Sequence, residues 1–139
     1  MKFDLETRAE VRIHAYATGA ITLAVPGSLE TDLAVDPETG LCQVAQSLIL
    51  TPQQLITDWE PNQLDELTAA HLDVVLNLEP ELILLGTGAR QQFPAMDIML
   101  PLHRARIGVE VMDTAAACRT FNILVGEGRH VAAALMMIE

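Results

Sequence analysis

The sequence predicts a single α/β domain over residues 1–139, with a small, mainly parallel sheet, helices and an N-terminal antiparallel β part. From residue 68 onward, helical and strand patterns alternate as α-β-α-β-α-β, which is typical of parallel strands joined by right-handed crossovers. Residues 9–25 alternate apolar and polar side chains instead, as antiparallel strands do. Half of the residues are apolar, but the chain has only one Trp, one Tyr and three Phe. The core must therefore use small and branched side chains, which let sheets and helices approach closely.

The N-terminal third is predicted to be rich in β-structure. Residues 9–25 form a hairpin, and Gly19 supplies the positive φ of its turn. Two turn clusters, at 26–28 and 36–40, interrupt the acidic segment that follows. Two more short strands are predicted at 47–52 and 54–59, because both segments are rich in Leu and Ile.

The C-terminal part is predicted to alternate helices and strands. Thr68 is the expected N-cap of the first helix, although the helical pattern could instead begin near Asn62. Pro101 predicts a kink or an early stop in the second helix, on which Met96, Met99, Leu100 and His103 share a face. We interpret five methionines as filler of the core: Met96, Met99, Met112, Met136 and Met137. The predicted elements are helices at about 69–77, 96–105 and 114–125, and strands at 82–85, 108–112 and 130–137.

The charge distribution argues against nucleic acid as a partner. The formal net charge is −11, of which residues 1–80 contribute −10 and residues 81–139 only −1. Nucleic acid and anionic membrane surfaces both require cationic neutralisation. All five bases of the second part are arginines, which suit bidentate contacts with carboxylates or phosphates and protein interfaces.

The location predicted from the sequence is cytoplasmic. The longest apolar run, residues 131–138, is far shorter than the roughly 20 residues that span a bilayer, so we expect no membrane insertion. Residues 1–6 contain acids and no apolar core of a signal peptide.

No catalytic set, cofactor or metal site is predicted, and enzymatic activity is the less favoured expectation. Cys42 and Cys118 have no metal-ligand spacing, and we read them as reduced structural thiols. The four histidines form no HxH or HxxxH pair, and none is spaced to activate Cys118. A metal site would need residues that converge from distant parts of the chain.

Two strand-end turns are the candidate binding site. The first contains Gly86, Thr87, Gly88, Arg90 and Gln91. It lacks the third glycine of a dinucleotide fingerprint, and a tight turn satisfied within the protein is the competing interpretation.

The second turn leads into the helix at 114–125. Asp113 or Thr114 is the expected N-cap, and capping is favoured over anion binding because the Asp113 carboxylate already occupies the helix start. Arg119 and Asn122 are further candidate polar groups. Ligand sites lie at the carboxyl ends of parallel strands, so the two turns should be neighbours if their strands are adjacent.

The helix at 114–125 also predicts an interface. Its main apolar stripe comprises Ala117, Phe121, Leu124 and Val125, whereas Ala116 and Ile123 lie on another flank. Ile123 therefore needs cover, either from the N-terminal β layer or from a second subunit. We expect a weak homodimer or higher oligomer through this face, because the nearly neutral C-terminal part tolerates a symmetric partner better than the acidic part does.

Three sequence blocks resemble one family of small domains of unknown function. That family includes the mitochondrial complex I assembly factor 3 and the adipogenesis-associated domain protein of animals. The blocks are residues 84–94, residues 108–124 and Glu127-Gly128-Arg129, with looser matches at 49–52 and 58–59. Because residues 1–6 do not look like a transit peptide, the chain resembles the bacterial branch. The resemblance implies a three-layer fold with a mixed, partly parallel sheet. It also implies a role in protein interaction, and no established enzyme activity or cofactor.

Two functions follow as hypotheses. The first is a non-catalytic binding protein that assists assembly of a respiratory or membrane protein complex through a protein partner not yet identified. The second is a small-molecule (anion) binding protein or enzyme, with a site between the Gly86–Gly88 loop and the start of the 114–125 helix. The absent catalytic set, the arginines and the unassigned Ile123 favour the first.

Overall fold

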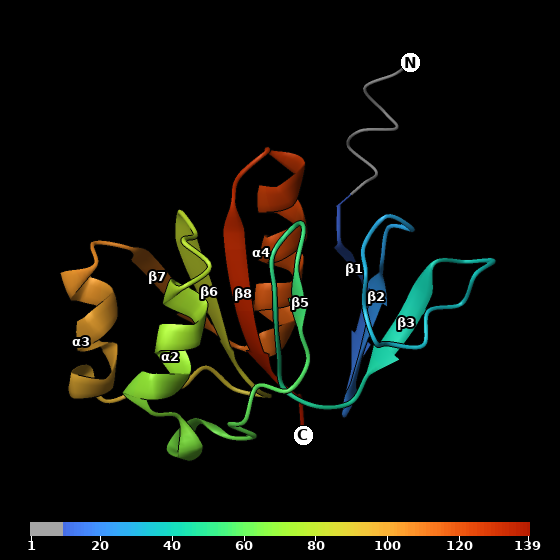
Figure 1. Cartoon of the computed structure of the whole chain (residues 1–139). Coiled ribbons are helices and arrows are strands. Elements are labelled where there is room, and N and C mark those ends of the chain that lie inside the picture. The colour runs from blue at the N-terminus through green and yellow to red at the C-terminus, as the bar shows by residue number, and fades with distance from the viewer. Residues whose placement is uncertain (1–9) are drawn as a thin grey trace.

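A computed structural model describes residues 10–139 of the chain as three layers (Figure 1). The central layer is a five-stranded sheet, with α2 and α3 on one face and α4 with a three-stranded sheet on the other. The predicted α/β class with an N-terminal antiparallel layer is thus confirmed. Residues 1–6, which entered the prediction of location, lie outside the described residues. The elements are β1 (Arg12–Ala17), β2 (Ala20–Ala24), β3 (Leu41–Val44), β4 (Leu48–Leu50), β5 (Leu55–Ile56), η1 (Leu64–Glu66), α2 (Ala69–Leu76), β6 (Leu82–Thr87), α3 (Met96–Arg104), β7 (Gly108–Met112), α4 (Thr114–Gly126) and β8 (Val131–Met136).

The central sheet has the strand order β5-β4-β8-β6-β7. Strand β6 pairs in parallel with both β7 and β8, and β4 pairs antiparallel to β8. Helix α3 connects β6 to β7, and α4 connects β7 to β8, as the alternating pattern predicted. The carboxyl ends of β6, β7 and β8 therefore meet at one edge of the sheet.

The N-terminal sheet has the order β1-β2-β3 and is antiparallel throughout. Its hairpin turn contains Gly19 at φ +75°, which confirms the predicted turn. Strand β3 was not predicted, because it is short and lies between turn-forming residues. It forms by pairing with β2, and its alternate side chains Cys42 and Val44 are buried in the core.

The segment before α2 differs from the prediction. The ladder of β5 ends at Ile56, so the strand predicted at 54–59 is wrong beyond that residue. Trp59 is buried outside any strand, and its indole N–H donates to the His71 carbonyl oxygen (3.1 Å). Thr68 is the N-cap of α2, as predicted, and a separate 3₁₀ turn precedes it.

The core has two parts, one on each face of the central sheet. Strand β8 is buried along its whole length, and its run of small residues lets helices approach both faces. One cluster joins the sheet to α4 and the N-terminal sheet; the other joins it to α2, α3 and Trp59. Phe121 of α4 is fully buried in the first cluster. Between residues 10 and 139 no helix has the length and apolar content needed to cross a membrane.

Candidate functional site

The two predicted strand-end turns are neighbours. Gly86 at the end of β6 pairs with Met112 at the end of β7, as expected for adjacent parallel strands. A side chain at Gly86 would lie 2.9 Å from both Leu135 Cδ2 and Thr114 Oγ1, so glycine is required there for close packing. Gly88 has φ +95°, in the region that favours glycine. The two glycines are thus required for different reasons, Gly86 for close packing and Gly88 for its positive φ.

The first turn satisfies its own polar groups. The Thr87 hydroxyl donates to the Arg90 carbonyl oxygen (2.6 Å) and accepts from the Gln92 N–H (3.1 Å). The Gln91 side-chain amide donates to the Val111 carbonyl oxygen (2.9 Å). The Thr87 hydroxyl also lies 3.2 Å from the Met112 carbonyl oxygen, so Thr87 and Gln91 both hold the loop against β7. The Arg90 side chain remains exposed.

Thr114 links the two turns through hydrogen bonds. Its hydroxyl accepts from the Gly88 N–H (2.8 Å) and donates to the Met136 carbonyl oxygen (2.7 Å). Its own N–H donates to the Gly88 carbonyl oxygen (2.9 Å), and the residue is fully buried. Asp113 is the N-cap of α4 and accepts from the Ala116 N–H (2.8 Å). This geometry agrees with capping, the favoured interpretation of Asp113.

Arg119 and Asn122 point away from these turns and contact the N-terminal hairpin. Arg119 Nη1 donates to the Tyr16 hydroxyl oxygen (2.6 Å), and its guanidinium carbon lies 5.9 Å from the centre of that ring. The Asn122 side chain pairs with the Ile13 backbone, accepting from its N–H (2.9 Å) and donating to its carbonyl oxygen (2.7 Å). The predicted site residues thus divide into a strand-end group and a hairpin-contacting pair.

A shallow cavity of about 260 Å³ lies on the other flank of the first turn. The exposed Arg90 and Gln92 line it from the β6–α3 loop, and Asn62 and Gln63 line it from the segment before α2. Its remaining lining residues are Leu64, Thr87, Gly88, Ala89, Met137 and Glu139. The sequence prediction missed the contribution of Asn62 and Gln63, which only the fold brings to the loop.

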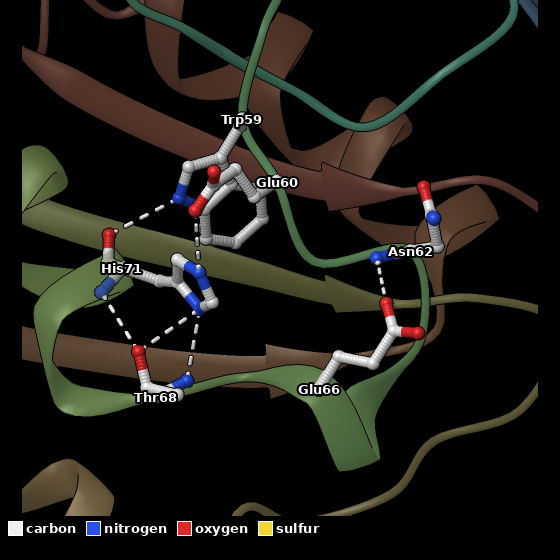
Figure 2. Close-up of polar contacts among 6 residues, drawn as sticks. All are labelled: Trp59, Glu60, Asn62, Glu66, Thr68 and His71. Carbon is white, nitrogen blue, oxygen red and sulfur yellow. Dashed lines mark hydrogen bonds and ion pairs between the residues drawn. The ribbon is translucent and has the colours of Figure 1, made fainter.

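A polar network around His71 was also missed (Figure 2). His71 Nδ1 accepts from the Thr68 N–H (3.0 Å), which leaves the ring hydrogen on Nε2, 3.3 Å from Glu60 Oε1. The Thr68 hydroxyl accepts from the His71 N–H (3.3 Å) and completes a capping box. The signal was the spacing Thr68-x-x-His71, with His in place of the usual Glu or Gln. The arrangement resembles a hydroxyl–imidazole–carboxylate set, but its contacts cap α2.

The cysteines lack the properties of a catalytic thiol. Burial raises the pKa of Cys118 to about 12, although Arg119 nearby lowers it slightly, and burial also raises the pKa of Cys42. Both thiols are free and buried. A reactive cysteine needs a lowered pKa and access to solvent. Within residues 10–139, no group of three or more His, Cys, Asp or Glu side chains is placed to hold a metal ion.

Two helices expose large apolar side chains. Ile123 on α4 is 60% exposed, so the N-terminal sheet does not cover it. Met96 on α3 is 78% exposed, and our interpretation of this methionine as core filler is wrong. The inward side of α3 is formed by Met99 and Leu102 instead.

Sequence comparison finds relatives of this chain among bacterial and animal proteins. The chain is 35% identical over 85 residues to the "13 kDa major membrane protein" of Francisella tularensis, covering 60% of this chain and 69% of that protein. It is 39% identical over 83 residues to the zebrafish (Danio rerio) NADH dehydrogenase [ubiquinone] 1 alpha subcomplex assembly factor 3, covering 58% of this chain and 48% of that protein. The matches span about half the length of the assembly factors.

Solved structures share the fold. A crystal structure from Bordetella parapertussis has a TM-score of 0.75 and 31% identity, and the match covers 93% of this chain and 97% of that one. An outer membrane protein from Bartonella henselae has a TM-score of 0.63 and 27% identity, with coverages of 95% and 98%. The model of the family described as "Protein of unknown function (DUF498/DUF598)" matches residues 13–136. The chain therefore belongs to the DUF498/DUF598 family.

Proposed function

We propose that this chain is a non-catalytic binding protein that assists the assembly of a respiratory or membrane protein complex. Relatives named as assembly factors of NADH dehydrogenase support a role with protein partners. We also propose that the chain acts in the cytoplasm. One relative bears the name of a membrane protein, so fractionation of cells is the appropriate check.

The exposed side of α4 is the observation that carries this proposal. Ile123 is an aliphatic side chain with 60% of its surface in solvent, in a helix whose other apolar residues are at least half-buried. Arg119 lies on the same helix, exposed and stacked near Tyr16. Aromatic residues and arginine are enriched at protein interfaces, where they supply much of the binding energy.

Affinity capture from a native extract tests the proposal. The wild type should retain a defined partner, and Arg119→Glu or Arg90→Glu should release it. Arg129→Glu makes the same charge change at the opposite end of the sheet, where its partner Glu81 is exposed, and should retain the partner. If neither the wild type nor Arg129→Glu retains a specific protein, the proposal fails.

A small-molecule (anion) site is the second candidate, and the 260 Å³ cavity beside the first turn favours it. Arg90 is the cationic group in that lining, and Asn62 and Gln92 add amide donors. Ligand present at 100 times its dissociation constant stabilises a protein by about 2.7 kcal/mol, which a thermal-shift screen detects. Phosphates or carboxylates should raise the unfolding temperature of the wild type and of Arg104→Ala, but not that of Arg90→Ala. A screen without any such shift removes this candidate.

A further inference from the structure

Helix α3 carries an exposed ridge that its own fold does not use. Met96 is 78% exposed and Leu100 is 38% exposed. With Arg104 they follow each other at intervals of four residues, so the three side chains form one row along the helix. Phe93, 71% exposed, precedes the N-cap Ala95 by two residues. We call Phe93, Met96, Leu100 and Arg104 the α3 ridge.

The position of α3 explains why this ridge faces solvent. The helix packs against α2 and the edge strand β7, at the margin of the molecule in Figure 1. Its inward side buries Met99 and Leu102 in the core cluster on that face of the sheet. The side chains of the ridge are therefore not required to fill that core, and their large apolar surface remains available for binding.

The segment of sequence that carries the ridge is more basic than the rest of the chain. Residues 82–107 contain three arginines and one aspartate, a balance of +2 in a chain of net charge −11. Arg104 and the nearby Arg106 are both exposed, and neither forms an ion pair with any residue in the described range 10–139. A partner for this surface must thus supply both apolar side chains and negative charge.

We propose that the α3 ridge docks an acidic amphipathic helix of another protein, an inference that rests on the proposed role in protein binding. A ridge of helical side chains fits the groove between side-chain rows of a second helix. Arg104 and Arg106 would pair with carboxylates, for which the planar guanidinium is suited. Phenylalanine, methionine and arginine are also the residue types enriched at interfaces.

A second copy of this chain does not offer such a helix within residues 10–139. Helices α2 and α3 contain one acid each, Asp73 and Asp97, and α4 contains none. An anionic membrane is disfavoured because the whole protein, at −11, is repelled by a surface of the same sign. The ridge is short, and its two arginines supply only about 1 kcal/mol each toward an anionic bilayer. An acidic amphipathic helix of another protein, which supplies apolar side chains and carboxylates to the ridge, is thus the preferred partner.

Model peptides test this proposal with the full chain. The probe is a helical peptide with a leucine stripe and glutamates on its flanks; its counterpart has lysine in place of every glutamate. Calorimetry should show binding of the glutamate peptide, and Met96→Glu and Arg104→Glu should each weaken it about tenfold or more. Thr18→Glu and Arg129→Glu are controls at exposed positions outside the ridge, and they should leave binding unchanged. Arg104→Glu should also gain affinity for the lysine peptide, which shows that this variant remains folded and functional.

Three outcomes overturn the inference. They are equal binding of both peptides by the wild type, equal weakening by the control variants, and binding to vesicles that contain phosphatidylglycerol but not to the glutamate peptide. Failure here is distinct from failure of the proposed function. If the glutamate peptide does not bind but affinity capture still retains a partner that Arg119→Glu releases, the α3 ridge is wrong and the binding role stands.

Discussion

Helices α3 and α4 both connect parallel strands of the same sheet, yet they are buried very differently. Helix α4 contacts β6 and β8 of the central sheet and β1 of the N-terminal sheet. Phe121, Ala117 and Val125 are buried there. Helix α3 lies at the edge of the sheet, and Met99 and Leu102 are its buried residues. A helix that connects two parallel strands is therefore deeply buried in the case of α4 and lies at the edge of the fold in the case of α3.

The difference shows that an apolar residue on a helix face is buried only if the fold places another layer over that face. The central sheet and the N-terminal sheet each contact α4, and among its large apolar residues Ile123 alone stays mostly exposed. On α3, one side is covered, and Met96 and Leu100 remain in solvent. We therefore expect substitutions at the buried positions of α4 to change stability, and substitutions at the exposed positions of α3 and α4 to change binding.

The largest expected effect is at Phe121. Phe121→Ala removes a fully buried ring from the cluster that joins the two sheets, and it should lower the free energy of unfolding by about 3–5 kcal/mol. Met96→Ala removes an exposed side chain, and its effect should stay within about 0.5 kcal/mol. Urea titration of both variants measures the contrast. Equal losses would mean that α3 contributes to the core as much as α4 does.

A smaller loss is expected at the start of α4. Thr114→Val keeps the shape of the side chain but leaves the Gly88 N–H and the Met136 carbonyl without their buried partner, at a cost of about 1–3 kcal/mol. Thr120→Val is the matched control, because its hydroxyl donates to Ala116 within the same helix, and it should cost about 0.5 kcal/mol or less. If the two valines are equally tolerated, Thr114 does not hold the turns together.

The sequence predicted much of the C-terminal part because its signals are local. Thr68 and Asp113 are caps whose side chains bond the residue three positions on, and strands β6 and β8 are largely continuous apolar runs. Helix α3 begins at the predicted residue and continues past Pro101 to Arg104, so the predicted early stop does not occur. Packing against α2 and β7 holds the last turn, which local propensity does not reveal.

What the sequence could not predict depends on distant residues. Strand β3 is held by pairing with β2, and the His71 network depends on Glu60, eleven residues earlier. The division of the candidate site has the same cause. Asn122 is nine residues from Asp113 along the same helix, but its side chain bonds Ile13, 109 residues away. The helical period predicts which residues share a face of a helix. The arrangement of the layers in the fold determines which other element packs against that face.

The buried thiol of α4 predicts a pH dependence of stability. In the folded chain burial raises the pKa of Cys118 to about 12, whereas the ordinary value is 9.0. Between these values the unfolded thiol loses its proton and the folded thiol keeps it, so stability is unaffected below pH 9 and falls as the pH rises above it. The loss should be about 1 kcal/mol by pH 10. Cys118→Ala should show a flatter decline in urea titrations between pH 8 and pH 10; an equal decline would place the effect on other groups.

The smallest effect on stability is expected at Ile123, where the proposal of self-association is tested. Ile123→Asp places a charge at a position that is 60% exposed, so the free energy of unfolding should change by about 0.5 kcal/mol or less. If Ile123 and Ala116 form an interface between two copies, sedimentation should show a wild type that associates at high concentration and a variant that is a folded monomer. Asp73→Ala is the control, because it changes an exposed residue of α2, and it should associate as the wild type does. If the wild type stays monomeric at every concentration, Ile123 does not mediate self-association. Its exposed side chain would then be, like the α3 ridge, a surface for binding a different protein.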